Sequence, residues 1–238
     1  MPESLRAIAK AIDHSLLHPT LTDQELRKGC EFARENDLAA VSIKPYAVPL
    51  AREILKGAEV AVGAVVGFPH GNNHIEIKVR EAELACAEGA TELDAVLNIG
   101  KVLSRDWDYI SAEITALNEI AAANGALLKI IFENDFLPED SYKIKLCEIC
   151  SAVAVAFVKT STGYGFVKQS NGMYSYQGAT DHDLALMRKT CAPGIRVKAA
   201  GGIRSLDEML KVLKLGVSRV GLSATKAILE EARSRGYK

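Results

Sequence analysis

The sequence predicts an α/β fold, a single parallel (β/α)₈ TIM barrel that occupies residues 1–238. Short runs rich in β-branched residues recur along the chain, and each is followed by an amphipathic stretch long enough for a helix. No Pro/Gly/Ser-rich linker interrupts this alternation, so we expect one domain. An open, doubly wound sheet is the alternative fold for the same alternation.

Eight segments have the length and composition of strands buried on both faces. They are residues 12–16, 39–43, 60–66, 92–98, 127–132, 154–159, 196–200 and 218–222. Apolar residues at helical spacing lie between them, as at Ile75, Val79, Ala82, Leu84 and Ala85. The carboxyl ends of barrel strands meet on one face, where barrel enzymes keep their active sites.

The charge balance argues against a polyanionic partner. Twenty-nine Lys and Arg residues face 30 Asp and Glu residues, which gives a formal net charge of -1. This balance predicts a small-molecule substrate rather than nucleic acid or a membrane surface. The first residues lack the apolar core of a signal peptide, and no apolar run approaches about 18 residues, so we expect a cytoplasmic protein.

The cysteines do not indicate a disulfide framework, because the five are scattered and odd in number. Cys147 and Cys150 form a C-x-x-C pair within a stretch of helical periodicity. No second cysteine pair is present to complete a zinc site. We therefore expect two reduced helix residues and no metal.

Ionisable residues inside predicted buried strands are the strongest functional signal. They are Asp94, Lys129, Lys159 and Lys198. Burial lowers the pKa of a lysine from about 10.4 and leaves a partly neutral, nucleophilic amine. Lys159 and Lys198 fall on neighbouring predicted strands, so each ammonium disfavours protonation of the other. Alternatively, these lysines point outward into the helix layer or pair with Asp94 or Glu92, an interpretation that we favour for Lys129.

Glycine-rich turns follow the last two predicted strands, at Gly201-Gly202 and at Gly221. Glycine lets backbone N–H groups approach a phosphate closely, and barrels commonly bind phosphate at these two loops. Arg204 and Ser223 offer a guanidinium and a hydroxyl to the same oxygens. The turns predict a phosphorylated ligand, although glycines there can also serve packing alone.

Seven segments from the first predicted strand to the last resemble signature segments of the deoxyribose-phosphate aldolases, in the same order. They are IDHSLLHP, GAVVGFPHG, EGATELDAVLNIGK, AFVKTSTG, GATDHDLALM, VKAAGGIRS and SRVGLSAT. The resemblance implies a class I aldolase on a (β/α)₈ barrel that acts without metal or other cofactor. It implies reversible cleavage of 2-deoxy-D-ribose 5-phosphate to D-glyceraldehyde 3-phosphate and acetaldehyde. Relatives are often dimers, so a homodimer is also expected.

The resemblance also assigns roles to individual residues. Lys159 takes the Schiff-base position, Lys198 the position of the second lysine that lowers its pKa, and Asp94 that of the carboxylate in the proton relay. The substrate and phosphate contacts carry over to Ser15, Gly163, Gly201, Gly202, Arg204, Gly221 and Ser223. Tyr237, next to the last residue, is expected as an extra proton carrier that folds back to the site.

Some positions depart from the family pattern. Ala200 and Ala224 replace customary serines, and the loop 163–180 is longer than expected. Each lost hydroxyl removes a hydrogen bond worth roughly 1.5 to 3 kcal/mol to a charged oxygen. An aldolase with a less phosphate-dependent substrate is therefore an alternative.

Three other functions compete with the aldolase. A metal-dependent aldolase or hydrolase would use His14, His18, His70 and His74. A phosphosugar isomerase or epimerase would share the glycine turns but would not need two neighbouring lysines. A non-catalytic phosphosugar-binding barrel would bind the same ligand without turnover.

Overall fold

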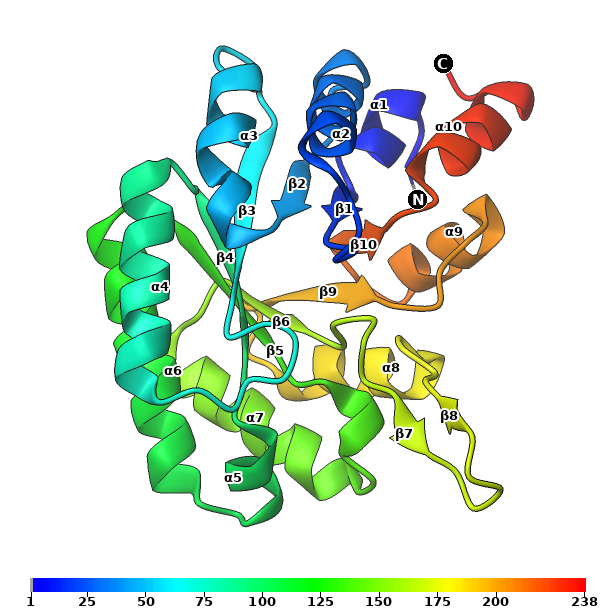
Figure 1. Cartoon of the computed structure of the whole chain (residues 1–238). Helices are drawn as coiled ribbons and strands as arrows, with labels where there is room; N and C mark the ends of the chain where they lie inside the picture. The colour runs from blue at the N-terminus through cyan, green and yellow to red at the C-terminus, as the bar shows by residue number, and fades with distance from the viewer. Residues whose placement is uncertain (1) are drawn as a thin grey trace.

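The computed structural model describes residues 2–238 and shows a closed barrel of parallel strands (Figure 1). The strand order around the barrel is β1-β10-β9-β6-β5-β4-β3-β2. Its strands are β1 (Ile12–Leu16), β2 (Ala40–Ile43), β3 (Ala61–Val66), β4 (Glu92–Val96), β5 (Leu127–Ile131), β6 (Phe157–Lys159), β9 (Arg196–Ala200) and β10 (Arg219–Leu222). Because β1 pairs with both β2 and β10, the sheet has no free edge. The predicted (β/α)₈ barrel is confirmed, and the open-sheet alternative is wrong.

Helices surround the barrel and connect its strands (Figure 1). They are α1 (Leu5–Ala9), α2 (Asp23–Glu35), α3 (Val48–Ile54), α4 (Ile75–Glu88), α5 (Ile99–Leu103), α6 (Trp107–Ala123), α7 (Asp140–Val153), α8 (Asp181–Thr190), α9 (Leu206–Lys214) and α10 (Thr225–Ser234), with 3₁₀ turns η1 (Pro45–Ala47) and η2 (Asn134–Phe136). Capping boxes start α2, through Thr22 and Glu25, and α9, through Ser205 and Glu208. Among residues 2–238, no helix is long and apolar enough to cross a membrane.

The apolar core lies mainly between the strands and the helices, whereas the barrel interior is charged. Ile12, Val41 and Val158 are fully buried among apolar neighbours. Asp13, Lys129 and Lys198 are equally buried but carry charge. Buried charges cost free energy unless they are paired, so this interior requires close ion pairs.

One strand boundary predicted from the sequence needs correction. The sixth barrel strand begins at Phe157 rather than at residue 154, because Ala154 has φ +58° and ends α7 with a left-handed residue. Leu84, one of the apolar residues at helical spacing in α4, is 50% exposed. Cys147 and Cys150 lie in α7 as predicted, where both are buried and free.

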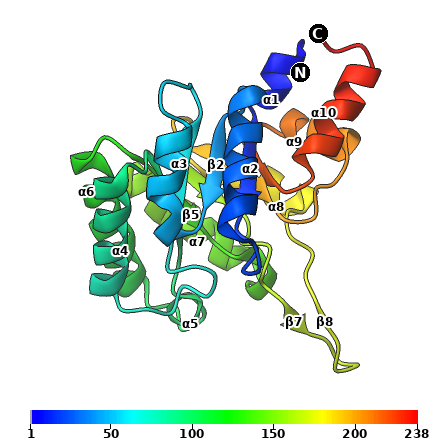
Figure 2. The ribbon, with the colours of Figure 1, turned by 45° about the horizontal axis from the view of Figure 1, so that its top comes forward.

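The long loop after β6 contains a β-hairpin that projects from the barrel (Figure 2). Its strands β7 (Val167–Lys168) and β8 (Tyr174–Ser175) pair antiparallel. These two strands were not predicted from the sequence, although Asn171-Gly172 is a typical turn signal, and Gly172 has φ +82°. We refer to residues 163–179 as the hairpin segment.

Candidate active site

Lys159 and Lys198 lie side by side in the barrel wall, opposite each other in the register of β6 and β9. The Nζ atom of each is 2.7 Å from Oδ2 of Asp94 on β4. Lys198 also reaches Asp13 on β1, at 2.5 Å, across the barrel interior. Both lysines therefore point into the barrel, and the alternative that they face the helix layer is wrong.

Lys129 belongs to the same interior network. Its Nζ lies 2.7 Å from Asp94 Oδ1, 2.5 Å from Glu92 Oε2 and 3.7 Å from Asp13 Oδ2. The predicted ion pair with Asp94 or Glu92 is thus confirmed. Arg219, at the start of β10, donates to Asp13 and to Glu92, the latter at 2.9 Å.

We call this network the interior charge cluster. Its members are Asp13, Glu92, Asp94, Lys129, Lys159, Lys198 and Arg219. The lysines and Asp94 were predicted from the sequence as functional residues, whereas Arg219 was not. The available signal was its place as a charged residue within a strand of otherwise apolar and small residues.

The cluster moves the pKa values of its members in opposite directions. Burial raises the pKa of the Asp94 carboxyl, but the ammonium groups of Lys129, Lys159 and Lys198 outweigh it and hold that pKa well below its usual value. Burial is also the largest influence on Lys159, and it lowers the pKa of this amine to about 8. The Asp94 carboxylate opposes this shift, and the Lys198 and Lys129 ammonium groups add to it.

The charge count of the cluster explains why an amine gives up its proton. Four basic side chains, Lys129, Lys159, Lys198 and Arg219, face three acidic ones, Asp13, Glu92 and Asp94, so full ionisation leaves 4 − 3 = +1. An excess charge in a buried site is costly, and loss of one proton removes it. Lys159 has the lowered pKa and is therefore the amine that becomes neutral.

A cavity of about 450 Å³ opens above the two lysines at the carboxyl ends of the strands. It brings together nine of the residues predicted from the sequence, namely Ser15, Lys159, Gly163, Lys198, Gly201, Gly202, Arg204, Gly221 and Ser223. Gly201 and Gly202 have φ +82° and +83°, values that favour glycine. Ala200 also lines the cavity, so the replacement of this serine falls within the site, whereas Ala224 is not a lining residue.

The hairpin segment contributes residues to this cavity that the sequence analysis did not predict. Tyr164, Phe166 and Tyr176 line it together with the lysines and the glycine turns. A long loop rich in Gly, Ser and Tyr after the sixth strand was the available signal.

Tyr237 does not reach the cavity. Strand β10 ends at the mouth of the barrel, and α10 runs back from there, so the residues after it lie at the opposite end of the barrel. There the backbone N–H of Leu5 donates to the carbonyl of Lys238 at 2.8 Å, and Tyr237 packs against the apolar core. The structure thus gives no support to Tyr237 as a proton carrier.

The four histidines of the metal-dependent alternative form no cluster of metal ligands. Within residues 2–238, the only such grouping is Asp140, His182 and Asp183. The ammonium of Lys143 bonds Asp140 at 3.0 Å and Asp183 at 2.6 Å, so a cation already occupies these carboxylates. His14 is partly buried, which lowers its pKa to about 4, and its Nδ1 lies 2.8 Å from the Thr225 hydroxyl.

Comparison with known proteins agrees with this geometry. Residues 7–230 match the family model described as DeoC/LacD family aldolase. The chain belongs to this aldolase family. It is 45% identical over 228 residues to a deoxyribose-phosphate aldolase of Rhodopirellula baltica, which covers 96% of this chain and 90% of that protein. Another deoxyribose-phosphate aldolase, from Caldanaerobacter subterraneus subsp. tengcongensis, is 45% identical over 98% of this chain and 97% of its own.

Solved structures of aldolases share the whole fold. The deoxyribose phosphate aldolase of Aeropyrum pernix, described as a tetramer, superposes with a TM-score of 0.86 at 27% identity, over 98% of this chain and 93% of its own. An aldolase designated QR15 superposes equally well at 32% identity, over 96% of both chains. Membership of an aldolase family agrees with the two lysines in the barrel interior. It does not favour the isomerase or the metal-dependent enzyme.

Proposed function

We propose that the protein is a class I aldolase that cleaves 2-deoxy-D-ribose 5-phosphate through a Schiff base on Lys159. The observation that carries this proposal is one amine with a pKa of about 8, at the base of the cavity and 2.7 Å from the Asp94 carboxylate. An amine that is partly neutral near pH 8 can attack an aldehyde. The relatives named deoxyribose-phosphate aldolase support the choice of substrate.

The chemistry uses the amine as an electron sink. Neutral Lys159 attacks the C1 aldehyde of the open-chain sugar, and loss of water from the carbinolamine gives an iminium. The iminium accepts the electron pair of the C2–C3 bond as that bond breaks, while the C3 hydroxyl loses its proton and becomes the aldehyde of glyceraldehyde 3-phosphate. Protonation and hydrolysis of the enamine then release acetaldehyde and restore the amine.

Asp94 and Lys198 are the proposed proton carriers for these steps. Asp94 Oδ2 lies 2.7 Å from Nζ of Lys159 and 2.7 Å from Nζ of Lys198. A proton therefore needs to travel only a short distance between these groups. The Asp94 carboxylate also stabilises the positive charge of the iminium on Lys159, in a site where low polarity strengthens the attraction.

The phosphate of the substrate is proposed to bind where the glycine turns meet the mouth of the cavity. Gly163, Gly201, Gly202 and Gly221 provide close backbone approach, and Arg204 and Ser223 provide polar side chains. Because Ala200 lines the cavity without a hydroxyl, a less phosphate-dependent aldehyde substrate remains the second candidate. We further propose a cytoplasmic role in the breakdown of deoxyribose phosphate, and a self-associated protein, as in the tetrameric relative.

Trapping of the intermediate tests the proposal directly. Incubation with acetaldehyde and borohydride should reduce the iminium to a stable adduct, and peptide mass analysis should locate it at Lys159. Lys159→Leu should lose both the adduct and sugar cleavage while it keeps its circular dichroism spectrum. Lys168→Leu, on the exposed hairpin, is the matched control and should retain both.

Three outcomes would contradict the proposed function. Retained cleavage by Lys159→Leu would refute the assignment of the amine. An adduct located at Lys198 would transfer the role to the other lysine. Binding of the phosphosugar without any adduct would support a non-catalytic phosphosugar-binding barrel.

A further inference from the structure

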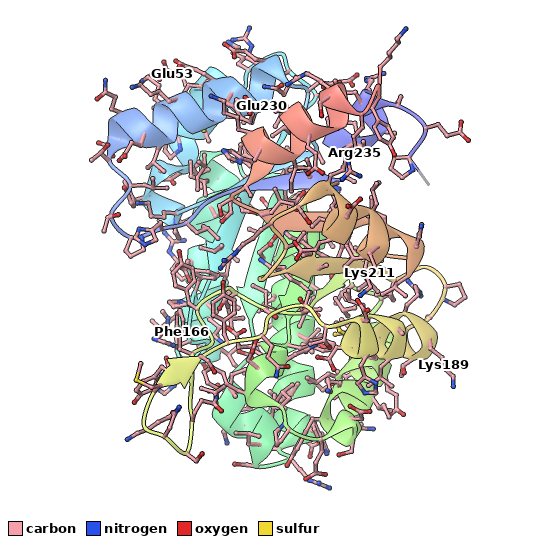
Figure 3. The ribbon with its side chains drawn as sticks, turned by 90° about the vertical axis from the view of Figure 1, so that its right-hand side faces the viewer. Glu53, Phe166, Lys189, Lys211, Glu230 and Arg235 are labelled. Atoms are coloured by element: carbon pink, nitrogen blue, oxygen red, sulfur yellow. The ribbon has the colours of Figure 1, made fainter. Side chains whose placement is uncertain are left out.

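The part of the cavity formed by the hairpin segment is aromatic. Tyr164, Phe166 and Tyr176 all line the cavity. The rings of Phe166 and Tyr176 contact each other edge to face, with centroids 5.1 Å apart, and Tyr164 contacts Phe68 in the same way at 5.6 Å. Figure 3 labels Phe166 near the base of the hairpin. We call Phe166 and Tyr176 the aromatic wall.

Two carboxylates that follow β5 hold the hairpin segment at both of its ends. Glu133 accepts hydrogen bonds from the backbone N–H of Thr162, at 3.1 Å, and from the Thr162 hydroxyl. Asp135 accepts from the backbone N–H groups of Gln177, at 2.5 Å, and of Gly178, at 3.0 Å. Since both limbs are tied to the same short turn, the base of the hairpin has a defined position at the cavity.

Close backbone packing adds to this anchoring. A Cβ atom on Gly178 would lie 2.5 Å from the carbonyl carbon of Gly201, and one on Gly165 would lie 2.6 Å from Cδ of Glu133. The returning limb therefore rests directly on one of the glycines proposed to bind phosphate. The aromatic wall and the phosphate-binding turn are thus parts of one surface.

The tip of the hairpin differs from its base. Met173 and Tyr174 are 67% and 62% exposed, and neither lines the cavity. The hairpin therefore carries one tyrosine at the cavity, Tyr176, and another in solvent, Tyr174, which makes Tyr174 a matched control.

We propose that Phe166 and Tyr176 are specificity-determining residues that contact the substituent of the acceptor aldehyde and favour an apolar or aromatic one. Aromatic side chains gain free energy when apolar groups displace water from their faces. A polar or charged substituent would contact Arg204 and the glycine turns instead. This inference rests on the proposed aldolase function.

The reaction in question is the addition of acetaldehyde to an acceptor aldehyde, the reverse of cleavage. The enamine on Lys159 forms a new bond from its C2 carbon to the carbonyl carbon of the acceptor, and the carbonyl oxygen takes up a proton to become a hydroxyl. Water then hydrolyses the iminium, which releases a 3-hydroxyaldehyde and returns the amine. No oxidant, reductant or further co-reactant is required.

Kinetics with two acceptors test the inference. Acetaldehyde addition to 3-phenylpropanal and to glyceraldehyde 3-phosphate would be measured for the unaltered protein, Phe166→Ala, Tyr176→Ala and the control Tyr174→Ala. The wall variants should lose about two- to tenfold in kcat/KM for 3-phenylpropanal, mostly through KM, as expected for an aromatic contact. The loss with glyceraldehyde 3-phosphate should be smaller, and Tyr174→Ala should match the unaltered protein with both acceptors.

Equal losses for the two acceptors, or unchanged kcat/KM for 3-phenylpropanal, would overturn the inference. The borohydride adduct at Lys159, measured on the same samples, separates the two proposals. If the adduct forms but the wall variants keep their acceptor preference, only the inference fails. If the unaltered protein forms no adduct, the aldolase function itself fails.

Discussion

At Lys159, the effects of burial and of the neighbouring charges can be compared on a single nitrogen. Burial lowers its pKa most, and the Asp94 carboxylate at 2.7 Å opposes that shift. The ammonium groups of Lys198 and Lys129 tip the balance further toward the neutral amine. The chemistry proposed here therefore depends on where the surrounding charges lie as well as on the lysine itself.

Removal of the Lys198 charge should move the pH profile. In Lys198→Met, Lys159 loses a repelling neighbour and no longer shares Asp94, so its pKa should rise above about 8. Because only the neutral amine attacks, the acidic limb of the activity profile should shift to higher pH. At pH 7 the rate should fall about 10²-fold, a loss that includes the missing proton carrier.

The pH dependence of kcat/KM checks this prediction. Lys211→Met removes an exposed lysine that pairs with Asp181, and it should leave the profile unchanged. A Lys198→Met profile with the same midpoint as that of the unaltered protein would show that Lys198 does not influence the amine.

Glu133 should make stability depend on pH. Burial raises the pKa of this carboxyl from 4.5 to about 7, although its hydrogen bonds from Thr162 oppose the shift. The folded protein therefore keeps a proton that the unfolded chain has released, and this contribution is full below about pH 4.5 and lost as pH rises through 7. The loss is at most about 3 kcal/mol.

Urea unfolding of the unaltered protein and of Glu133→Gln, at pH 5 and pH 8, measures this pH-dependent contribution to the free energy of unfolding. Glutamine resembles the protonated carboxyl, so the unaltered protein should lose stability relative to the variant as pH rises. A difference between the two proteins that is the same at both pH values would contradict the assignment.

Among the elements, the strands of the barrel could be predicted from the sequence, whereas for the hairpin only the turn Asn171-Gly172 gave a signal. Most of the buried parallel strands are short runs dominated by apolar residues, so their existence is evident even where a boundary is wrong, as at Ala154. Strands β7 and β8 are two residues each and bury little, so no periodicity marks them. Their position depends on Asp135, which lies far from them in the sequence.

The same reasoning applies to the candidate site. Lys159, Lys198 and Asp94 could be selected because a charge inside an apolar strand is anomalous. Phe166 and Tyr176 carry no such signal, because aromatic residues in a long loop are compatible with many positions. Only the folded chain places them at the cavity.

Loss of the Asp135 carboxylate should loosen the hairpin. Asp135→Ala removes the acceptor of the backbone N–H groups of Gln177 and Gly178. Hydrogen bonds to a charged group are worth about 1.5 to 3 kcal/mol, so tryptic cleavage at the exposed Lys168 should be at least about tenfold faster. KM for 3-phenylpropanal should rise with little change in the rate of adduct formation from acetaldehyde alone.

Asp181→Ala is the matched control, since Asp181 lies just after the hairpin segment and pairs with the exposed Lys211. It should leave cleavage at Lys168 unchanged. Equal cleavage rates for Asp135→Ala and the unaltered protein would mean that the returning limb is held by its backbone packing on Gly201 and by the hydrogen bond from Ala179 N–H to the Gly201 carbonyl.

At the scale of the whole molecule, the interior charge cluster joins strands from around the barrel. Arg219 on β10 bonds Asp13 on β1 and Glu92 on β4, and its side chain is only 15% exposed. Arg219→Met would remove one cationic partner from each of these buried carboxylates, while Lys198 stays paired with Asp13 and Lys129 with Glu92. The free energy of unfolding should fall by about 1 to 3 kcal/mol, because each carboxylate loses one buried hydrogen bond.

Urea unfolding tests this value, with Arg235→Met as the control because that arginine pairs with Asp207 on the surface and should matter little. Glu92→Gln should cost less stability in the Arg219→Met background than in the unaltered protein, because Glu92 has then already lost its contact with Arg219. Strictly additive losses for Arg219→Met and Glu92→Gln would show that the arginine acts through packing against Phe157.

The aromatic wall and the interior charge cluster differ in how they are attached to the barrel. The wall is borne by a segment that leaves the barrel after β6 and returns before α8, whereas the cluster is built from the strands themselves. Exchange of the hairpin for a shorter or longer one would alter which aldehydes fit, yet leave the basicity of the reacting nitrogen as it is. New acceptors could thus be acquired by an enzyme of this design without rebuilding its chemistry.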